Sequence, residues 1–256
     1  MKIRRADAAL LPQMKALWQT CFGDSETYIE QYYDRFGTEN SVVIERDGFL
    51  YAMGSCIPVD YVQPDGDVQK GAYLYAVCTH PDFRHQNCCF NVCEAAASFK
   101  KADGCDFLFL RPGEPGLVKM YEKFGFTMSL TAEEQTFAAA SKDGITFRAL
   151  TAQDYAMYRQ MLLRGGFIDW QAEALGHQAS QGELLAISGN DSFAIAAAEG
   201  DRCPEFLGDP VLAGALAAKL GLPSVRCRMP GSTPFAMAKA LTGKPLPTGY
   251  AGFVFD

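Results

Sequence analysis

The first part of the chain passes from a strand pattern of apolar residues to two helical patterns. Residues 2–5 form a short β-rich run, and Asp7 follows as a residue that can cap a helix. Apolar side chains then recur at intervals of three and four, which predicts a helix through Leu10, Met14, Leu17, Trp18 and Phe22. A second helical pattern contains Tyr28, Ile29, Tyr32, Tyr33 and Phe36. The pattern therefore predicts a strand followed by two helices with apolar faces.

Two β-rich runs, residues 41–45 and 49–56, follow and are joined by Arg46-Asp47-Gly48. Asp-Gly between two such runs is a strong signal for a β-hairpin. A further pair of runs, 60–62 and 69–77, flanks another polar turn. The first half of the chain thus supplies several antiparallel strands.

The stretch 73–126 combines a strand, a turn, a helix, a second strand and a final short helix. An apolar run at 73–77 enters a polar turn at 79–87, and a helical pattern follows from Cys88 to Lys100. A second apolar run at 107–110 and a short helical pattern complete the stretch. The first amide N–H groups of a helix lack partners within it, and the helix dipole is positive there. This layout therefore suits the binding of a phosphorylated cofactor.

A strand at 127–140 and a polar break at 141–144 follow the stretch 73–126. The second half of the chain then repeats the order of elements of the first half. The predicted elements are strand 145–149, a helix through Asp154, Tyr155, Tyr158, Met161 and Leu162, a hairpin of 184–188 and 193–197 around Asn190-Asp191, a short strand at 206–207, helix 210–220, strand 225–229, helix 234–241 and strand 250–255. We interpret the repeat as a tandem duplication of one α+β unit, with domains 1–140 and 145–256.

The second copy lacks the polar turn of the first. Where Arg84 to Cys89 would recur, the chain has Gly208-Asp209-Pro210-Val211, which contains no basic residue. An anion site is therefore expected in the first copy alone, and the second copy is interpreted as degenerate.

Composition narrows the classes of function. The 256 residues carry a formal net charge of −7, which argues against nonspecific binding of nucleic acid or of an anionic membrane. No apolar run approaches the roughly 20 residues that span a bilayer. The N-terminus has charges without an apolar stretch behind them, so we expect a cytoplasmic protein with no secretory signal.

The nine cysteines lie scattered through apolar segments. In a reducing cytosol they are expected to be free thiols. Cys88, Cys89 and Cys93 lie close together, but they lack the paired spacings and matching histidines of a metal site. We interpret them as small buried side chains on a helix and expect no metal.

Two segments of the stretch 73–126 resemble the GNAT superfamily, the GCN5-related N-acetyltransferases. Ala76-Val77-Cys78-Thr79-His80-Pro81-Asp82-Phe83-Arg84 resembles the family's strand and V-x-T-H-P-x-Y-R turn. Residues 117–126, with Tyr121-Glu122-Lys123-Phe124-Gly125-Phe126, resemble its Y-x-x-x-G-F close. The resemblance implies an α+β fold in which each copy is a mixed, mostly antiparallel sheet flanked by helices. Two tandem copies are similar to acetyltransferases of the enhanced intracellular survival type, without the third domain that those carry.

The resemblance also implies acetyl-CoA as the cosubstrate. The strand at 77–79 would pair with the pantetheine arm, and the amides of 86–90 would receive the pyrophosphate with the help of Arg84. The implied cosubstrate-binding residues are Val77, Cys78, Thr79, Arg84, His85, Gln86, Asn87, Cys88, Cys89 and Phe90. The strand at 107–110 would separate from the preceding strand and leave a slot for the acyl group.

The turn departs from the family pattern Arg/Gln-x-x-Gly-x-Gly/Ala. Asn87 and Cys89 stand where the glycines would be. Glycine there permits a close approach of the backbone to phosphate, and Asn tolerates unusual backbone angles better than most residues. Cys89 adds a side chain at a crowded point. His85 either contacts a phosphate or is an exposed residue without a role.

By the resemblance, Tyr121 falls where the family places the general acid that protonates the leaving thiolate. The alternative interpretation is that Tyr121 is only a packed aromatic residue on a helix face. The general base stays open: Glu114 follows the second strand of the stretch, and Asp256 offers the terminal carboxylate. The early helix aromatics either pack in the core or line the acceptor pocket, in a cleft bounded by the early helices, the central sheet and the second domain.

These expectations combine into an N-acetyltransferase that transfers an acetyl group from acetyl-CoA to a primary amine by direct attack. The acceptor is a small molecule or a peptide, and the acidic balance slightly favours a cationic one, such as a polyamine, an aminoglycoside or a lysine side chain. The alternative from another class is a non-catalytic acyl-CoA-binding or regulatory protein. A third reading keeps the fold and transfers another acyl or aminoacyl group.

Overall fold

The computed structural model describes residues 1–141, 143–189 and 191–255. Three residues of the sequence-based expectations lie outside these ranges: Lys142 of the polar break, Asn190 of the predicted hairpin turn and Asp256, the candidate base. The chain divides into two compact units. The first contains residues 1–60, 69–128 and 237–246, and the second contains 61–68, 129–236 and 247–256.

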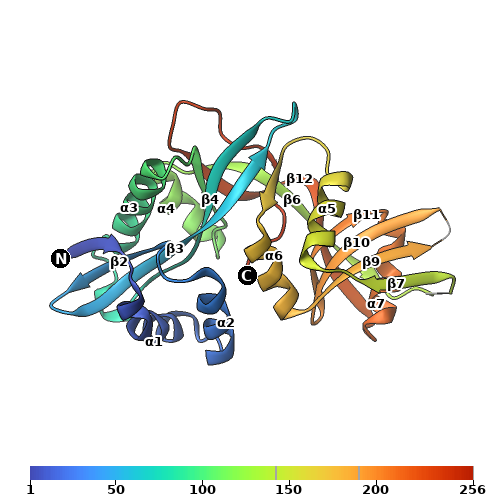
Figure 1. Ribbon diagram of the computed structural model, residues 1–256, viewed down its shortest axis with the longest axis horizontal. Helices are drawn as coiled ribbons and strands as arrows, with labels where there is room; N and C mark the ends of the chain where they lie inside the picture. Colours follow the sequence, from blue (N-terminus) through green and yellow to red (C-terminus); the bar gives the residue numbers. More distant parts are fainter. Residues whose placement is uncertain (142, 190, 256) are drawn as a thin grey trace. The chain divides into compact units, whose positions relative to one another are not determined.

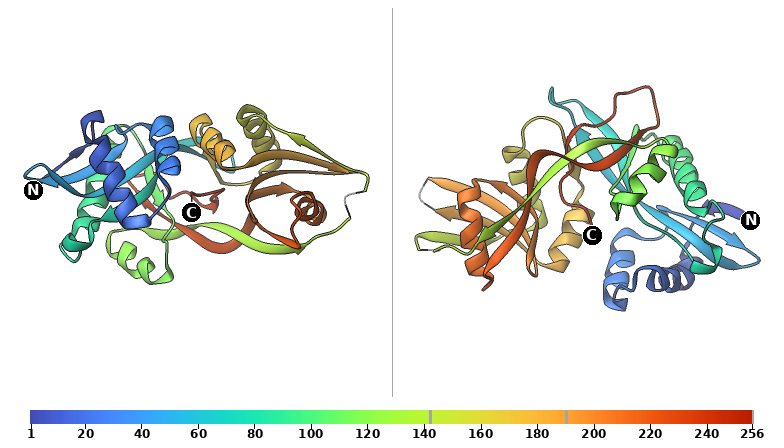
Figure 2. Two further views of the ribbon diagram at one scale, coloured as in Figure 1. Left: turned by 90° about the horizontal axis from the view of Figure 1, so that it is seen from below. Right: turned by 180° about the vertical axis from the view of Figure 1, so that it is seen from behind.

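The first unit is a mixed sheet with helices on both faces (Figures 1 and 2). Its elements are β1 (Lys2–Arg5), α1 (Leu11–Phe22), α2 (Glu26–Phe36), β2 (Ser41–Arg46), β3 (Phe49–Val62), β4 (Val68–Thr79), α3 (Cys88–Ala102), β5 (Phe107–Leu110), α4 (Val118–Lys123) and the end of β12 (Ser224–Ala240), with single 3-10 turns at Ala8–Leu10, Pro81–Phe83 and Pro115–Leu117. The strand order is β1-β2-β3-β4-β5-β12. Helices α1 and α2 lie on one face, and α3 and α4 lie on the other.

Local sequence signals explain the start of this unit. Asp7 accepts a hydrogen bond from the amide of Ala9 and caps the first turn. Gly23, with φ of 74°, ends α1, and the Ser25 side chain caps α2 by accepting from the amide of Tyr28. The predicted hairpin is confirmed, because β2 and β3 pair antiparallel up to the turn at Asp47.

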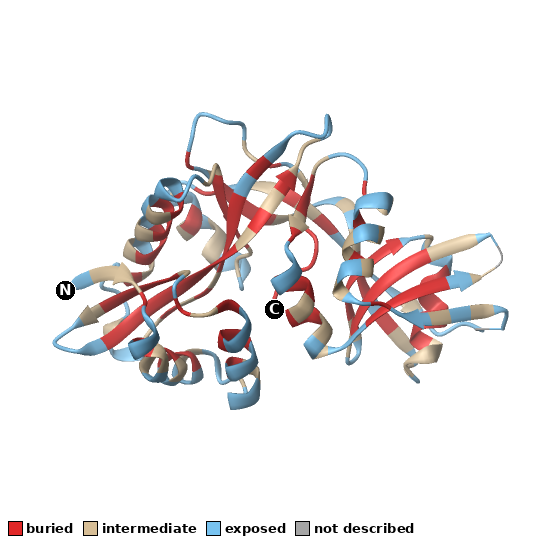
Figure 3. Cartoon of the chain, in the orientation of Figure 1, coloured by how far each residue is buried: buried red, intermediate tan, exposed pale blue. Residues whose placement is uncertain are grey.

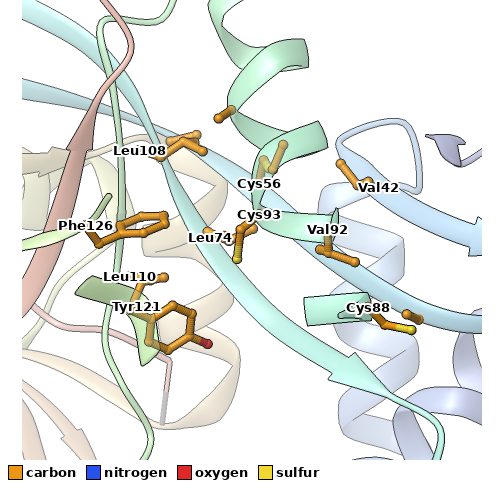
Figure 4. Close-up of a cluster of buried hydrophobic side chains, with 14 of the residues drawn as sticks. Val42, Cys56, Leu74, Cys88, Val92, Cys93, Leu108, Leu110, Tyr121 and Phe126 are labelled. Atoms are coloured by element: carbon orange, nitrogen blue, oxygen red, sulfur yellow. The ribbon is translucent and has the colours of Figure 1, made fainter. Parts of the chain in front are cut away.

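Apolar residues are buried on both faces of the first sheet, and Figure 3 shows buried positions along its strands and helices. On the α3 and α4 face, residues of β2 to β5 pack against both helices, and Figure 4 shows Val92, Leu108, Leu110, Tyr121 and Phe126 in this cluster. The opposite face is aromatic. The Trp18 ring lies 4.8 Å from the ring of Tyr32 and 5.7 Å from that of Tyr75. The helix aromatics therefore form a core with β4.

The second unit repeats this pattern of elements. It contains β7 (Ile145–Ala149), α5 (Ala152–Leu162), β8 (Phe167–Trp170), α6 (Ala172–Gln181), β9 (Glu183–Gly189), β10 (Ser192–Glu199), β11 (Arg202–Gly208), α7 (Ala213–Lys219), β13 (Gly249–Tyr250), a 3-10 turn at Pro210–Leu212, most of β6 (Thr127–Ala138) and residues 224–236 of β12. Strands β7, β9, β10 and β11 pair antiparallel, and β11 pairs parallel to β12.

The two sheets share their connectivity. In the first unit, β4 and β5 are parallel and α3 connects them, while in the second, β11 and β12 are parallel and α7 connects them. The predicted fold class, two tandem mixed sheets flanked by helices, is therefore confirmed. The domain bounds 1–140 and 145–256 stay a prediction, since they describe copies along the sequence. The compact units are divided differently: residues 61–68 and 129–140 belong to the second unit, and residues 237–246 belong to the first.

Two predicted elements need correction, and two observed elements were not predicted. Residues 234–241 are not a helix, because β12 continues to Ala240 and pairs antiparallel with β5. Their alanine and methionine content favours a helix locally, but the open edge of β5 supplies backbone partners that override this preference. Of the predicted strand 250–255, Tyr250 alone lies in a strand, although Ala251 to Phe255 are buried. The strand β8 and the helix α6 were not predicted.

A buried ion pair ties α5 to β11 in the second unit. The Arg159 side chain, fully buried, donates to both carboxylate oxygens of Glu205 at 2.7 and 3.0 Å. It also donates to Asp169 at 3.2 Å, and the Tyr155 hydroxyl donates to Glu205 at 3.1 Å. Burial alone lowers the pKa of Arg159, but the two carboxylates and Tyr155 outweigh burial and raise it. This network satisfies the charges on the face of β11 opposite α7.

Removing one partner of this pair leaves a buried charge without its counter-ion. We expect Arg159→Met to lower the free energy of unfolding by about 3–5 kcal/mol in denaturant titration. The double variant Arg159→Met/Glu205→Leu is expected to lose less than Arg159→Met, because it no longer buries an unpaired carboxylate. Lys219→Met, which removes an exposed pair with Glu183, is the control and is expected to lose at most about 1 kcal/mol. A similar loss for Arg159→Met and Lys219→Met would contradict the assignment.

Candidate functional site

The candidate site begins where β4 and β5 stop pairing. Their parallel ladder runs from Gly71↔Phe107 to Tyr73↔Phe109. Beyond Tyr73, β4 continues to Thr79, whereas β5 ends at Leu110. Ala76 has φ of 50°, which interrupts the extended backbone of β4 directly after the ladder ends. The end of β4, which contains Val77, Cys78 and Thr79, is therefore not paired with β5.

The far edge of β5 is covered by the end of β12. Met237 pairs with Leu110, and Ala240 pairs with Phe107. The Lys239 amine donates to the carbonyl of Phe124 at 2.8 Å, just after α4, and forms an ion pair with Glu94 of α3. A segment from late in the chain thus fixes both β5 and the end of α4.

The polar turn after β4 is held by contacts at its two ends, and its middle is exposed to solvent. The Phe83 ring stacks on Tyr51 with 4.7 Å between centroids, and the Cys88 thiol donates to the carbonyl of Phe83 at 3.5 Å. The His80 imidazole accepts from the amide of Asp82 at 3.3 Å. Between these anchors, residues 84–87 are all exposed. The structure therefore holds the base of the turn and presents its polar residues to solvent.

Two residues of the turn have left-handed backbones. The φ angle is 62° at His85 and 59° at Asn87. Asn87 is the residue before α3, and its side chain makes no capping hydrogen bond. The amide of Asn91 bonds back to the carbonyl of Asn87, so the amides of Cys88, Cys89 and Phe90 are the first-turn donors without partners within the helix. No acidic side chain lies in this first turn.

The second glycine position of the family pattern, Cys89, points toward the core. Its thiol is half-buried, packs against the core cluster of the α3 face and interacts with Cys93 and Tyr121. The hydrogen bond from Cys93, and secondarily that from Tyr121, lowers the pKa of Cys89. Burial, followed by Cys89 and Cys93, raises the pKa of Tyr121. Figure 4 shows the Tyr121 hydroxyl directed toward the side where Cys88 and Cys93 of α3 lie.

The structure brings most of the implied residues into one region of the first unit, from the end of β4 to the first turn of α3. Tyr121 joins this region through Cys89. Glu114 is exposed and precedes the 3-10 turn at Pro115–Leu117, and no contact with Tyr121 is recorded for it among the described residues. Asp256 lies outside the described residues.

In the second unit, the carboxylate of Asp209 occupies the corresponding turn. The Asp209 carboxylate accepts from the amide of Val211 at 3.0 Å and from the hydroxyl of Ser192 at 2.7 Å. The bond from Ser192, and then that from Val211, lowers the pKa of Asp209. A carboxylate therefore occupies the place where an anion would bind, and α7 behind it has seven residues.

The sequence alone did not indicate a role for Cys21 in α1. Its thiol donates to the carbonyl of Thr79 at 3.5 Å, across 58 positions of sequence, and it interacts with Cys78 and Arg84. No local spacing could have shown this contact, because it depends on how α1 packs against β4.

Across residues 1–141, 143–189 and 191–255, no cluster of three or more His, Cys, Asp or Glu side chains is arranged to hold a metal ion. In the same part of the chain, no helix combines the length and apolar character that crossing a bilayer requires.

Comparison with known proteins places the chain in a family. The profile of a family described as an acetyltransferase (GNAT) domain matches residues 2–129, half of the chain. The chain belongs to the GNAT acetyltransferase family. The chemistry of this family is acyl transfer, and the matched range includes the turn before α3 and Tyr121. No curated protein matches the sequence.

Solved GNAT structures share the fold across nearly the whole chain. A GCN5-related N-acetyltransferase from Kribbella flavida has 14% identity and a TM-score of 0.71, with coverage of 94% of this chain and 72% of that one. Eis1 from Mycobacterium abscessus has 9% identity and a TM-score of 0.67, with 94% and 74% covered. A putative acetyltransferase from Pyrococcus horikoshii has 10% identity and a TM-score of 0.63, with 99% and 94% covered. These similarities confirm the tandem GNAT arrangement as a fold.

The left-handed backbone of Asn87 gives a test of the turn. We expect Asn87→Ala to lower the free energy of unfolding by about 1 kcal/mol, because alanine lacks the short polar side chain that makes the left-handed conformation tolerable for asparagine, whereas Asn87→Gly should be tolerated. Asn91→Ala is the matched control inside α3, where alanine is the best helix former, and it should cause no loss. Equal losses in Asn87→Ala and Asn91→Ala, measured by denaturant unfolding, would contradict the assigned backbone.

Proposed function

We propose that the chain is an N-acetyltransferase that transfers an acetyl group from acetyl-CoA to a primary amine. The observation that carries this proposal is the family match over residues 2–129, which contains the end of β4, the turn before α3 and Tyr121. The amine attacks the thioester carbonyl directly, the C–S bond breaks, and CoA leaves as a thiolate. The acceptor is a small molecule or a peptide.

The first turn of α3 would bind the pyrophosphate. The helix has fifteen residues, so its dipole is well developed, and its first-turn amides have no acidic neighbour in that turn. Arg84 lies exposed at the entry to the turn and adds a positive charge. His85 to Phe90 surround these amides, and the side chains of His85, Gln86, Asn87 and Phe90 are exposed.

The end of β4 would hold the pantetheine arm. Val77, Cys78 and Thr79 lie beyond the ladder with β5, so the space on that side of β4 is not taken by backbone pairing. An extended amide chain can pair with a strand edge through main-chain hydrogen bonds. The thioester would then lie near the ends of β4 and β5.

Tyr121 would assist the leaving thiolate by donating a hydrogen bond. Burial keeps its phenol protonated, because the pKa of Tyr121 is raised. A thiol has a pKa of about 8.5, so complete proton transfer from this phenol is uphill. We therefore assign Tyr121 the stabilisation of the developing negative charge on sulfur. The neutral amine attacks, and the proton that its nitrogen loses after attack is the source of the proton on the final CoA thiol.

We propose that the acceptor substrate is a cationic amine. The net charge of −7 favours a positively charged substrate by steering. Strand β4 offers no carboxylate between Ala72 and Val77, and on the face toward α2 the Tyr28 and Tyr75 hydroxyls lie 2.9 Å apart. An ordered water, Glu114 or the carboxylate of Asp256 would remove the amine proton.

One observation favours a second candidate, a non-catalytic acyl-CoA-binding or regulatory protein. The Tyr121 hydroxyl is engaged with Cys89, a residue that stands in a glycine position of the family turn. If this interaction persists with the cosubstrate bound, the phenol is not available to sulfur.

Binding and turnover separate the two candidates. We expect calorimetric titration to show binding of both acetyl-CoA and CoA, and a screen of primary amines with a thiol-release readout to find an acceptor. Arg84→Ala should weaken binding about tenfold, as expected for the loss of one charged phosphate contact. Binding of acetyl-CoA without thiol release for any class of amine would support the non-catalytic protein. No binding of acetyl-CoA or CoA at millimolar concentration would contradict both candidates.

Tyr121→Phe tests the role of the phenol once an acceptor is known. We expect kcat to fall about 100-fold with little change in the dissociation constant of acetyl-CoA, because the hydrogen bond forms to charge that develops in the transition state. Tyr51→Phe, at another buried tyrosine of the same core, is the control and should retain kcat. Unchanged turnover in Tyr121→Phe would remove Tyr121 from the mechanism.

A further inference from the structure

A pair of cysteine thiols lies beside the end of β4. Cys21 belongs to the last turn of α1, and Cys78 is the penultimate residue of β4. The two thiols are within hydrogen-bonding reach of each other, and the Cys21 sulfur lies 3.5 Å from the carbonyl oxygen of Thr79. Two side chains from distant parts of the sequence therefore bring their thiols close together at the end of β4.

The two thiols differ in exposure and surroundings. Cys78 is 7% exposed and packs near Tyr33 of α2. Cys21 is only partly buried, and Arg84, exposed in the turn after β4, faces its sulfur. The hydrogen bond from Cys78, and then the charge of Arg84, lowers the pKa of Cys21 to about 7. The same contact and burial raise the pKa of Cys78.

We propose that Cys21 and Cys78 are a redox-active dithiol that closes into an intramolecular disulfide on exposure to a hydroperoxide. A thiolate next to a cation, with solvent access and a second thiol in contact, has the features of a peroxide-sensitive cysteine with its resolving partner. The inference goes beyond acetyl transfer and does not depend on it.

The reaction balances with one hydroperoxide. The Cys21 thiolate attacks a peroxide oxygen, the O–O bond breaks, and Cys21 becomes a sulfenic acid while hydroxide leaves. The sulfur of Cys78 then attacks the sulfur of Cys21, the S–O bond breaks, and the S–S bond forms. The released hydroxide takes the proton of Cys78 and leaves as water. The two thiols are oxidised, and hydrogen peroxide is reduced to two waters.

The chain permits a direct assignment of the product. Trypsin cleaves after Lys15 and Arg35, and after Lys70 and Arg84, so Cys21 and Cys78 fall in separate peptides, 16–35 and 71–84, that contain no other cysteine. We expect the full-length protein, reduced and then treated with hydrogen peroxide, to yield these two peptides joined and lighter by two hydrogen atoms. Cys21→Ser should abolish the joined peptide. Cys78→Ser should leave a sulfenic acid on Cys21 that dimedone traps.

A second measurement tests the reactivity of Cys21 without requiring the disulfide. At neutral pH, iodoacetamide should modify Cys21 at least about tenfold faster than Cys105, because the reaction needs the thiolate. Cys105 is also partly buried, and burial raises its pKa, so it is the matched control. Equal rates at the two thiols, or peroxide treatment that joins other cysteine peptides in preference to 16–35 and 71–84, would overturn the proposal. Circular dichroism verifies that both serine variants are folded.

Discussion

The first unit depends on the pairing of one short strand on both of its edges. β5 is parallel to β4 on one side and antiparallel to the end of β12 on the other. Because its ladder with β4 ends at Tyr73, the last residues of β4 are not paired with β5. Because its other edge is covered by residues 237–240, β5 stays inside the sheet and its four residues are completely buried. The geometric basis of the candidate site is that β5 is paired on both edges, whereas the end of β4 is no longer paired with β5.

The two copies of the fold treat the helix after the turn in opposite ways. In the first, an exposed turn with Arg84 leads to the first-turn amides of α3, and no acidic residue belongs to that first turn of the helix. In the second, the Asp209 carboxylate already accepts from the amide of Val211 and adds negative charge at the same place. The same order of elements therefore gives one helix start that favours an anion and one that repels it. The shared fold explains the architecture, and a few side chains at the helix start decide where an anion would bind.

Patterns of short range were sufficient to predict most elements of the fold. The hairpin at Asp47-Gly48, helix α3 and the repeat of the second unit all follow from capping residues and apolar periodicity. The exchange of residues 61–68 and 237–246 could not be predicted, because it depends on which strand edges remain open after the rest has folded. This is also why a helix at 234–241 was the wrong prediction. The contact of Cys21 with Cys78 depends on the packing of α1 on β4, which the sequence pattern does not specify.

Asn87 and Cys89, which replace the two glycines of the family pattern, are subject to different structural constraints. At position 87 the constraint is the backbone, and Asn87 adopts the left-handed conformation that glycine would supply. At position 89 the constraint is space, because a side chain directed at the ligand would keep the backbone from approaching a phosphate. The Cys89 side chain instead turns inward, packs against the core and meets Tyr121. The Cys89 side chain therefore does not cover the first-turn amides of α3. The cysteine at this position instead contacts Tyr121. For the proposed function, the departure from the family pattern would bear more on the role proposed for Tyr121 than on the proposed binding of the pyrophosphate.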